Sequence, residues 1–365
     1  MKTPITFRRR LLLTCCCSLL VLLLVALQVV HQAPQMELPA GCWSVPEPRL
    51  GAAVLPQYGR YRYLLNSPVC GGGEEVRAVI VVHSDPRRPE VRQAIRDSLP
   101  AAELAQLGLR RAFMLAEAST RLNVNDTTIS QIAIATENAL YHDVVQGDFH
   151  DSYYNLTYKH IMALDWATTF CPQARLIHFC CRHIIKMDDD IAYNVYEVLH
   201  LLEKSPDNGY LGGNAFRKAK PYRGDSKWHV SLEEWPKEYY PPYVSGWLYI
   251  ASQDMASAMV RRSTELPFFW IDDLFITGMI TERMAINITG FNDLFATSAE
   301  CVRHTVNQSY PRLGRPNGTV FSPSVVVTPT DRDLDALKAF NKLCRYCRSR
   351  PCQKRERGKV CANTY

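Results

Sequence analysis

Residues 184–194 have the sequence IIKMDDDIAYN, in which the aspartates Asp188, Asp189 and Asp190 stand between two apolar runs. The pattern predicts a buried strand whose carboxylates reach solvent at its C-terminal end. Because alternate side chains of an extended chain point to the same face, we expect Asp188 and Asp190 to lie together and Asp189 to turn away. Two such carboxylates, with coordination positions left open, suit Mg²⁺ or Mn²⁺ bound to phosphate. A solvated acidic turn is the alternative interpretation.

The segments around this triplet predict an α/β fold. Residues 76–83, VRAVIVVH, form a β-branched apolar run that is typical of a strand buried on both faces. Pro89 opens the helical pattern of residues 89–99, and further strands are expected at 112–115 and near 144–145. Strands that alternate with helices favour a mostly parallel sheet. Open sheets of this kind bind ligands at the carboxyl ends of their strands, which is where the triplet is expected.

A second acidic pair, Asp272 and Asp273, precedes the helical pattern of Phe275, Ile276 and Met279. A carboxylate in this position can simply cap the helix by accepting backbone N–H bonds. Two adjacent carboxylates exceed what a cap requires. If one of them faces a cleft shared with the triplet, it can act as a general base toward a hydroxyl group.

The N-terminal part of the chain predicts a membrane anchor. The basic residues 1–10 are followed by the uncharged residues 11–30, a length of twenty that just crosses the hydrocarbon core of a bilayer. We therefore expect a cytosolic tail, an uncleaved signal anchor and a lumenal remainder. A cleaved signal peptide is the alternative, although its apolar core is normally shorter and ends in small residues. Residues 31–75 contain scattered prolines and a run of three glycines, which predicts a stem.

Two further features agree with a lumenal location. Asn-X-Ser/Thr sequons, which are glycosylation sites in the secretory pathway, occur at Asn125, Asn155, Asn287, Asn307 and Asn317. Asn155 also fits a helix N-cap. Ten cysteines follow residue 30, an even number for which disulfides are the expected state in an oxidising compartment.

The C-terminal residues 341–365 are basic and contain Cys344, Cys347, Cys352 and Cys361. Four cysteines at this spacing could bind zinc in a nucleic-acid-binding module. A lumenal location argues against that interpretation, and the net charge of +6 is no signature of nucleic-acid binding. We expect disulfides among these four cysteines to close the tail. The positive charge of the tail is expected to contact acidic glycans or lipids.

Five segments together resemble a known family. They are EVRQAIRDS (90–98), FHDSYYNLTYKHIMALDWATTFCP (149–172), KMDDD (186–190), YPPYVSGWLYIAS (240–252) and DDLFITG (272–278). In order and in approximate spacing they are similar to motifs of the β1,3-galactosyltransferase-like enzymes of glycosyltransferase family 31. The resemblance covers roughly residues 76–300.

The resemblance implies a GT-A-type, Rossmann-like α/β fold with a mixed, mostly parallel sheet. It also implies an inverting transfer of a hexose from a UDP-sugar to a glycan hydroxyl. Asp188, Asp189 and Asp190 correspond to the metal and nucleotide-sugar motif, in which Asp188 and Asp190 would hold Mn²⁺, Asp190 most directly. Asp273 corresponds to the catalytic base, and Asp272 holds the acidic position before it. The segment Tyr240–Gly246 is expected to shape the floor of the sugar site.

Arg92 and Arg96 match the arginines of the first motif and are expected near the nucleotide. The chain departs from the family pattern at residues 176–183, LIHFCCRH, which are extra and are expected to lengthen or bulge the strand before Asp188. A histidine that relatives carry near the C-terminus is missing. His304, the last histidine of the chain, is a hypothetical replacement, for which an ordinary surface or core role is the alternative.

The sequence therefore predicts a single-pass type II protein of the Golgi membrane. Residues 1–10 form its cytosolic tail, 11–30 its anchor, 31–75 its stem, 76–340 its catalytic domain and 341–365 its basic tail. We expect a Mn²⁺-dependent hexosyltransferase that uses UDP-galactose or UDP-N-acetylglucosamine and acts on glycans of glycoproteins or glycolipids. The alternative is a catalytically inactive relative that only binds glycans.

Overall fold

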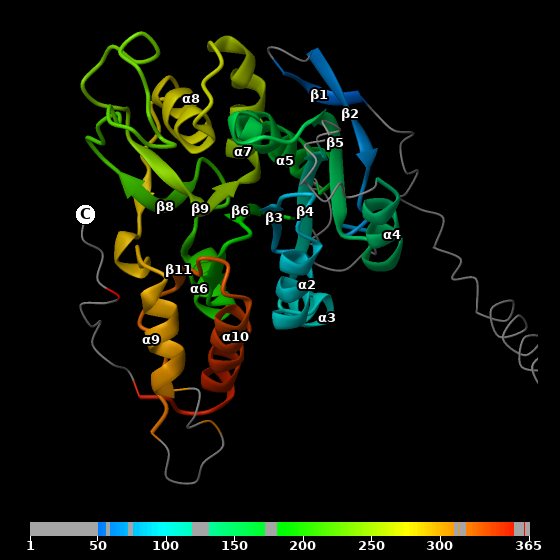
Figure 1. The fold of residues 1–365 in the computed structure, drawn as a ribbon, viewed down its shortest axis with the longest axis vertical. Helices are drawn as coiled ribbons and strands as arrows, with labels where there is room; N and C mark the ends of the chain where they lie inside the picture. The colour runs from blue at the N-terminus through cyan, green and yellow to red at the C-terminus, as the bar shows by residue number, and fades with distance from the viewer. Residues whose placement is uncertain are drawn as a thin grey trace, which may run out of the picture. The chain divides into compact units, whose positions relative to one another are not determined.

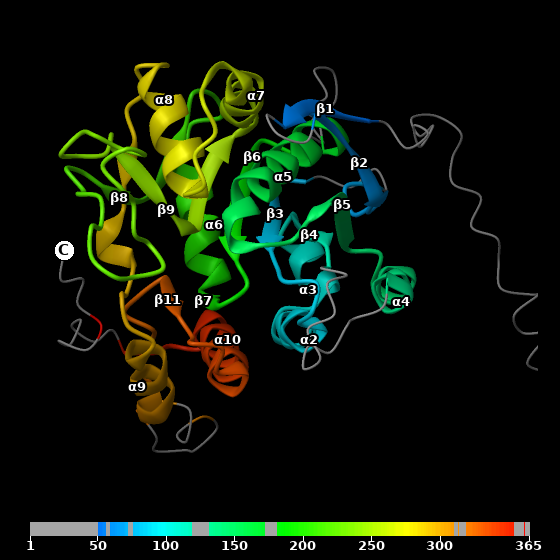
Figure 2. The same ribbon diagram turned by 45° about the horizontal axis from the view of Figure 1, so that its top comes forward.

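Within the residues that the structure describes, nine strands form one mixed sheet through the centre of the fold (Figure 1 and Figure 2). The computed structural model describes residues 50–55, 59–71, 76–118, 131–171, 181–309, 313, 319–353 and 361, which belong to one compact unit from Pro48 to Tyr365. The expected cytosolic tail and membrane anchor lie outside these ranges. Of the helices inside them, none has the length and apolar character needed to cross a bilayer.

The strands follow the order β1-β2-β5-β4-β3-β6-β9-β8-β10 across the sheet. Their bounds are β1 (Leu50–Leu55), β2 (Gly59–Leu65), β3 (Ala78–His83), β4 (Leu109–Glu117), β5 (Val144–His150), β6 (His183–Asp188), β8 (Leu211–Phe216), β9 (Tyr243–Ser252) and β10 (Thr289–Gly290). The four strands from β5 to β6 run parallel to one another, whereas β9 is antiparallel to both β6 and β8. The predicted mixed α/β sheet is confirmed, with its longest run of parallel strands in the middle and a second parallel pair, β8 and β10, at one edge.

Strand β3 separates two hydrophobic cores. Val79 and Val81 belong to one core and Ile80 and Val82 to the other, and all four side chains are fully buried. Burial of each such side chain is worth about 1.5–3 kcal/mol. This is why an unbroken β-branched run, and not an alternating one, forms the central strand.

Helices cover both faces of the sheet (Figure 1). Side chains of α5 and α7 fill the first core, and those of α2, α6 and α10 fill the second. The helix bounds are α2 (Pro89–Ser98), α3 (Ala101–Gln106), α4 (Gln131–Tyr141), α5 (Leu156–Phe170), α6 (Val195–Lys204), α7 (Gln253–Arg262), α8 (Ile280–Glu282), α9 (Glu300–Ser309) and α10 (Leu334–Ser349), with short turns of helix at η1 (Tyr153–Asn155), η2 (Ser263–Glu265) and η4 (Asn292–Leu294). The helices expected at 89–99 and after Asn155 are confirmed.

The structure corrects both ends of the predicted catalytic domain. The expected stem contains β1 and β2, and β2 pairs with β5. Tyr61 and Tyr63 of β2 are buried, and the hydroxyl groups of both donate to Asp165. At the other end, the predicted boundary at residue 340 falls inside α10. The folded domain is therefore longer in both directions than residues 76–340.

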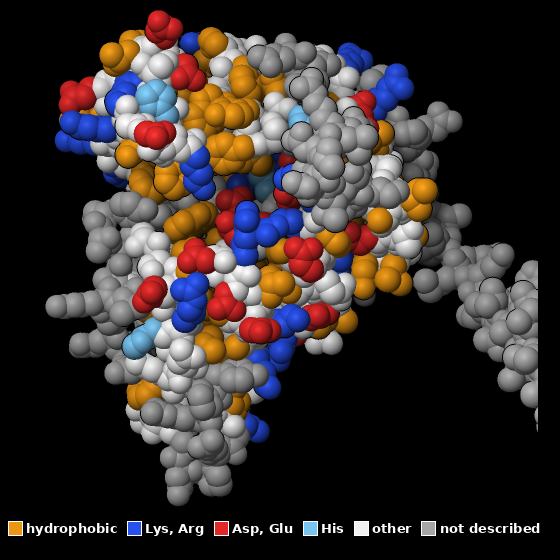
Figure 3. Space-filling view, in the orientation of Figure 1, with side chains coloured by type: hydrophobic (Ala, Val, Ile, Leu, Met, Phe, Trp, Pro, Cys, Tyr) orange, Lys and Arg blue, Asp and Glu red, His pale blue; other side chains and the backbone are white. Residues whose placement is uncertain are grey.

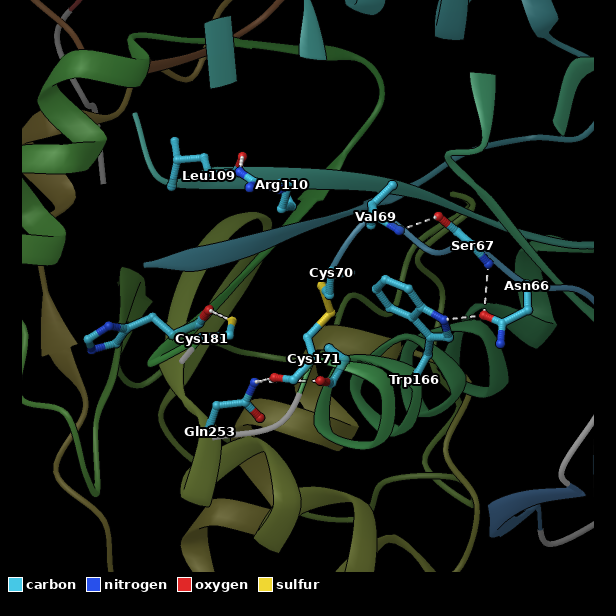
Figure 4. Close-up of a disulfide and its surroundings, with 12 residues drawn as sticks. Asn66, Ser67, Val69, Cys70, Leu109, Arg110, Trp166, Cys171, Cys181 and Gln253 are labelled. Carbon is cyan, nitrogen blue, oxygen red and sulfur yellow. Dashed lines mark hydrogen bonds between the residues drawn. A yellow bond between two sulfur atoms is a disulfide. The ribbon is translucent and has the colours of Figure 1, made fainter. Parts of the chain in front are cut away.

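Three disulfides occur among the described cysteines, so the expectation of disulfides is confirmed for these residues. Cys70–Cys171 ties the segment after β2 to the end of α5, next to the hydrogen bond that Trp166 donates to Asn66 (Figure 4). The other two are Cys301–Cys361 and Cys347–Cys352.

The prediction that the four tail cysteines pair with one another is wrong. Cys361 bonds to Cys301 of α9, outside the tail, and Cys344 is a buried free thiol on the inner side of α10. Only Cys347 and Cys352 pair within the tail. The physical reason is that α10 buries Cys344 in the second core, out of reach of the others.

Candidate active site

The carboxyl ends of β3 and β6 meet at one edge of the sheet, where His83 pairs with Asp188 in register. The antiparallel strand β9 brings Gly246 to the same edge. Asp272 and Asp273 stand at the start of η3 (Leu274–Met279), a π-helix of the kind often found at functional sites. These segments line one cleft of ≈ 710 Å³. Figure 3 shows a hollow in the middle of this face in which acidic side chains (red) lie beside basic ones (blue).

The triplet does not continue the strand as the sequence suggested. Strand β6 ends at Asp188, and a turn follows. Asp188 Oδ1 accepts a hydrogen bond from Lys186 Nζ (2.7 Å), and Asp189 Oδ2 accepts one from the Ser84 hydroxyl (2.7 Å). Because strand alternation stops at Asp188, Asp189 also lines the cleft, and the expectation that it turns away is wrong. Asp190 lines the cleft as well.

The strand before the triplet carries no bulge. All six residues of β6 pair with β3 in unbroken register, from His183 opposite Ala78 to Asp188 opposite His83. The expectation that residues 176–183 distort this strand is therefore wrong for the part that the structure describes. Residues 176–180 lie outside the described ranges.

Gly246 lies where the two acidic groups of the cleft, Asp188–Asp190 and Asp272–Asp273, come together. Its N–H donates to Asp273 Oδ2 (3.1 Å), and its carbonyl accepts a hydrogen bond from Lys186 Nζ (2.7 Å). A Cβ atom here would lie 2.9 Å from Lys186 Nζ, 3.5 Å from Asp273 Cβ and 3.8 Å from Asp188 Oδ2. Side chains far apart in the sequence thus converge on one spot, as predicted. The missing Cβ makes room for Lys186, a role for this glycine that the sequence did not reveal.

Lys186 is a buried cation between the two acidic groups. Its side chain is 1% exposed, and its Nζ lies 3.8 Å from Asp272 in addition to its bond with Asp188. Desolvation opposes its charge, but Asp188 and Asp272 raise its pKa. Sequence reasoning gave Lys186 no role, although a single lysine inside an apolar strand is a signal of a buried charge with a partner.

The neighbours Asp272 and Asp273 differ in acidity. Desolvation works to raise the pKa of Asp272, but Lys186 and the hydrogen bond from His160 bring it down to about 2. Desolvation and the adjacent Asp272 raise the pKa of Asp273 to about 7. Two carboxyl groups with pKa values pushed apart are a recognised arrangement of acid–base sites. Asp273 is thus suited to take up a proton, whereas Asp272 stays ionised.

His160 of α5 holds Asp272 in place. His160 Nδ1 lies 2.9 Å from Asp272 Oδ2, and Nε2 lies 2.6 Å from the hydroxyl of Tyr249. Burial lowers the pKa of His160, so its ring is neutral. With its proton on Nδ1 the ring donates to Asp272 and accepts from Tyr249, which satisfies both nitrogens. The sequence gave no sign of this partnership, because the three residues lie on separate elements.

Asp188 and Asp190 are the side chains of the cleft that could hold a divalent cation. Among the described residues, Oδ1 of Asp190 is buried without a hydrogen-bond partner, and the Asp190 carbonyl is fixed by the N–H and hydroxyl of Thr330. Desolvation, with a contribution from Asp190, raises the pKa of Asp188 to about 7 despite the opposing effect of Lys186. The part of the chain that the structure describes has no cluster of three or more His, Cys, Asp or Glu side chains placed to hold a metal. Substrate oxygens and water would complete the coordination, as is usual for Mg²⁺ with phosphates.

Thr330 reaches Asp190 through a small second sheet. Strand β7 (Ile191–Tyr193), directly after the triplet, pairs antiparallel with β11 (Val327–Pro329). This pairing also places Arg332, whose side chain is exposed and lines the cleft, two residues beyond Thr330. In this part of the chain the sequence indicated only that the histidine of the resembled family is missing. His304 is exposed on α9, is bonded to Gln308 and does not line the cleft, so the hypothesis that it assists a metal there is not supported.

Arg92 and Arg96 do not line the cleft. Both are buried on α2, where Arg92 forms two hydrogen bonds with Glu137 (2.8 and 2.6 Å) and Arg96 binds Asp143 and Glu137 (2.7 Å to each). The expectation that the two arginines approach a nucleotide is therefore wrong. The carboxylates of Glu137 on α4 and Asp143 in the following turn already satisfy the charges of both guanidinium groups. Arg92 also donates to the Asp85 carbonyl (2.7 Å), and so supports the loop behind the cleft.

Buried polar atoms without partners concentrate at the cleft. Among the described residues these include His83 Nε2, both side-chain amide atoms of Asn214 and the Tyr240 hydroxyl, and all three residues line the cleft. Native proteins leave few buried polar groups unpaired unless a ligand or water binds them. Sequence reasoning missed Asn214, for which the only signal is a polar residue inside the apolar strand β8.

The predicted glycosylation sites differ in their accessibility. Asn287 and Asn307 are exposed. Asn155 occupies the N-cap position of α5, but its side chain donates to the His150 carbonyl (2.8 Å) and does not cap the helix. Asn125 and Asn317 lie outside the described residues.

Comparisons with known proteins identify similar sequences. Residues 90–291 match the family model described as galactosyltransferase. Beta-1,3-galactosyltransferase 2 of Mus musculus is 30% identical over 226 residues, which are 60% of this chain and 51% of that protein. UDP-GlcNAc:betaGal beta-1,3-N-acetylglucosaminyltransferase 7 of Mus musculus is 32% identical over 241 residues, 64% of this chain and 58% of that protein. Beta-1,3-galactosyltransferase 5 of Homo sapiens is 32% identical over 215 residues, 58% of this chain and 64% of that protein.

The chain thus spans little more than half of the length of these relatives. Among solved structures, the glycosyltransferase GlyE of Streptococcus pneumoniae TIGR4 superposes with a TM-score of 0.33 at 10% identity, over 76% of this chain and 64% of that chain. That likeness is too low to bear on the fold.

Proposed function

Because the chain belongs to the galactosyltransferase family, whose model matches residues 90–291, we propose that it is an inverting β1,3-glycosyltransferase with a GT-A-type domain. It moves a hexose from UDP-galactose or UDP-N-acetylglucosamine to a hydroxyl group of a glycan. The two transferred sugars are those in the names of the similar proteins, one of which also names UDP-GlcNAc.

The observation that carries this proposal is the meeting of two acidic groups at Gly246. One group, at Asp188 and Asp190, is suited to a cation and hence to a diphosphate. The other contains Asp273, whose raised pKa of about 7 suits a general base. A sugar nucleotide placed across Gly246 would have its diphosphate at the first group and its anomeric carbon toward the second.

In the proposed reaction Asp273 accepts the proton of the acceptor hydroxyl as that oxygen attacks the anomeric carbon. The bond from this carbon to the UDP oxygen breaks at the same time, and the single displacement inverts the configuration. Asp188 and Asp190 would hold Mn²⁺, which would offset the charge that develops on the departing diphosphate. Arg332 is placed to contact the same phosphates. Lys186 and His160 keep Asp272 ionised, which in turn maintains the basicity of Asp273.

The donor hexose is expected at the deep end of the cleft. Asn214 is 1% exposed and offers both a donor and an acceptor without partners among the described residues. Tyr240 adds a hydroxyl group. Polar groups of this kind select between sugars, because a ligand that lacks the matching hydroxyl leaves them unpaired.

We place the protein in the Golgi membrane, with residues 11–30 as the anchor and the catalytic domain in the lumen. The three disulfides support an oxidising compartment. A distorted strand before the triplet would favour the alternative of an inactive glycan-binding relative, and the regular pairing of β6 gives that alternative no support.

The test is a donor screen with purified protein, with and without Mn²⁺. Release of UDP from UDP-galactose or UDP-N-acetylglucosamine should depend on Mn²⁺ and should increase when a β-galactoside acceptor is added. An Asp190→Asn variant should require more Mn²⁺ for half-maximal rate. Failure of the wild-type protein to bind or turn over either donor at any Mn²⁺ concentration would overturn the proposal.

A further inference from the structure

Four aromatic side chains from three separate segments gather at the mouth of the cleft. We call Tyr153, Tyr154, Trp228 and Trp270 the aromatic wall. Tyr153, Trp228 and Trp270 line the cleft, and Trp270 stands two residues before Asp272. Apolar side chains (orange) border the hollow from above in Figure 3.

Three rings of the wall, those of Tyr153, Tyr154 and Trp270, are in mutual contact, and Lys227 links the fourth to them. The ring centroid of Trp270 lies 5.9 Å from that of Tyr153 and 5.3 Å from that of Tyr154. Lys227 Nζ lies over both Trp228 (4.6 Å) and Tyr153 (5.8 Å), which links the two rings through cation–π contacts. These contacts fix the orientation of the rings before any ligand arrives.

The loop that carries Trp228 has no regular secondary structure and is held by hydrogen bonds from side chains. It connects β8 to β9, and the guanidinium of Arg223 donates to the carbonyls of Val230, Ser231 and Trp235, each at 2.6 Å. At the other side, the indole N–H of Trp270 donates to Glu234 of the same loop (3.1 Å). A long loop pinned in this way is typical of a binding element.

The wall remains open to solvent, unlike the polar groups deeper in the cleft. Tyr153, Tyr154 and Trp228 are 40%, 62% and 54% exposed. Exposed aromatic surface beside polar catalytic groups marks a binding surface rather than a core. Desolvation together with Asp272 and Asp273 raises the pKa of Tyr153 to about 12, which agrees with a hydroxyl close to those carboxylates.

From this arrangement we propose that the aromatic wall is the acceptor subsite, on which a pyranose ring of the acceptor glycan stacks with its hydroxyl turned toward Asp273. The inference deepens the proposed transferase function and depends on it. A pyranose whose axial hydrogens share one face presents an apolar patch to an aromatic ring, and a β-galactoside is such a sugar. Because a glycan continues beyond its terminal sugar, its subsite must open to solvent, whereas the donor hexose can be enclosed beside Asn214.

The test compares the full-length chain with Trp228→Ala, Trp228→Phe and Leu232→Ala variants. The probe is methyl β-D-galactopyranoside as acceptor, with whichever UDP-sugar the wild-type protein uses. Leu232 is the matched control, because it is an apolar residue of the same loop, is 69% exposed and does not line the cleft. Each variant is assayed for acceptor KM, donor KM, kcat and acceptor-independent hydrolysis of the donor.

Trp228→Ala should raise the acceptor KM about tenfold, the loss expected for one aromatic contact. Its donor KM and donor hydrolysis should match the wild-type values. Trp228→Phe should recover most of the acceptor affinity, and Leu232→Ala should leave all constants unchanged.

The inference is overturned if Trp228→Ala leaves the acceptor KM unchanged, or if only the donor KM rises. In both cases the proposed function still stands, since the wild-type protein transfers sugar. A wild-type protein that neither hydrolyses nor transfers any UDP-sugar overturns the proposed function and the subsite together.

Discussion

Replacing Gly246 with alanine introduces a single methyl group where the two acidic groups meet. The added Cβ would stand 2.9 Å from Lys186 Nζ, closer than real Cβ atoms approach other heavy atoms. The backbone itself accepts alanine, because Gly246 is not among the described glycines with positive φ. Lys186 must therefore move. Its Nζ is held at 2.7 Å from both Asp188 and the Gly246 carbonyl, so at least one of these hydrogen bonds is lost.

Losing one hydrogen bond to a charged group costs about 1.5–3 kcal/mol. We expect the free energy of unfolding to fall by that amount, as measured by urea denaturation followed by circular dichroism. The expected effect on catalysis is larger, because a displacement of about 1 Å in an active site can lower the rate about 10²-fold. The kcat of Gly246→Ala, measured as UDP release at saturating donor and acceptor, should fall by up to this factor.

Gly290→Ala is the matched control for this experiment. Gly290 lies in β10 and is exposed, and a Cβ atom added there would have its nearest neighbours at 3.1 Å and 3.4 Å, neither of them in the cleft. This variant should retain the wild-type kcat. If Gly246→Ala is as active and as stable as this control, Lys186 does not connect the two acidic groups in the way described.

Three other experiments test the same geometry. Asp273 must be ionised to accept a proton, and its pKa is raised to about 7, so kcat/KM should fall as the pH drops through this value. Asp272→Asn should move the midpoint of the profile to lower pH. A pH profile that is flat from pH 5 to 8 would contradict the assignment. Arg96→Met should lower the free energy of unfolding by about 3–5 kcal/mol, because it leaves buried carboxylates, including Glu137, with one cation fewer. The donor KM should stay constant. An increase in the donor KM would show that Arg96 does bind the nucleotide. Asn214→Leu should keep or raise the melting temperature and weaken donor binding at least tenfold, both measured by calorimetry. Lower stability with intact donor binding would show that Asn214 has a structural role only.

The parts of the fold that the sequence predicted are those decided by local patterns. The β-branched run of β3 is typical of a strand buried on both faces, and Pro89 marks the start of the helix α2. The triplet and the pair at 272–273 were also found, because acidic residues at the end of an apolar strand or before a helix stand out from their surroundings.

The parts that were missed depend on partners far apart in the chain. Arg92 and Arg96 look like anion-binding residues until Glu137 and Asp143 are brought beside them. Strand β2 stands in a proline-rich region, and only the alternation of buried tyrosines with exposed arginines reveals it. Pairing of Cys361 with Cys301 cannot be derived from spacing within the tail.

The most direct test of the account replaces Asp273 with asparagine and measures UDP binding and sugar transfer on the same preparation. Asparagine keeps the shape of the side chain but cannot accept the proton. The account predicts that titration calorimetry with UDP and Mn²⁺ gives the wild-type affinity, while transfer to the acceptor is abolished. Full transfer activity in this variant would contradict it.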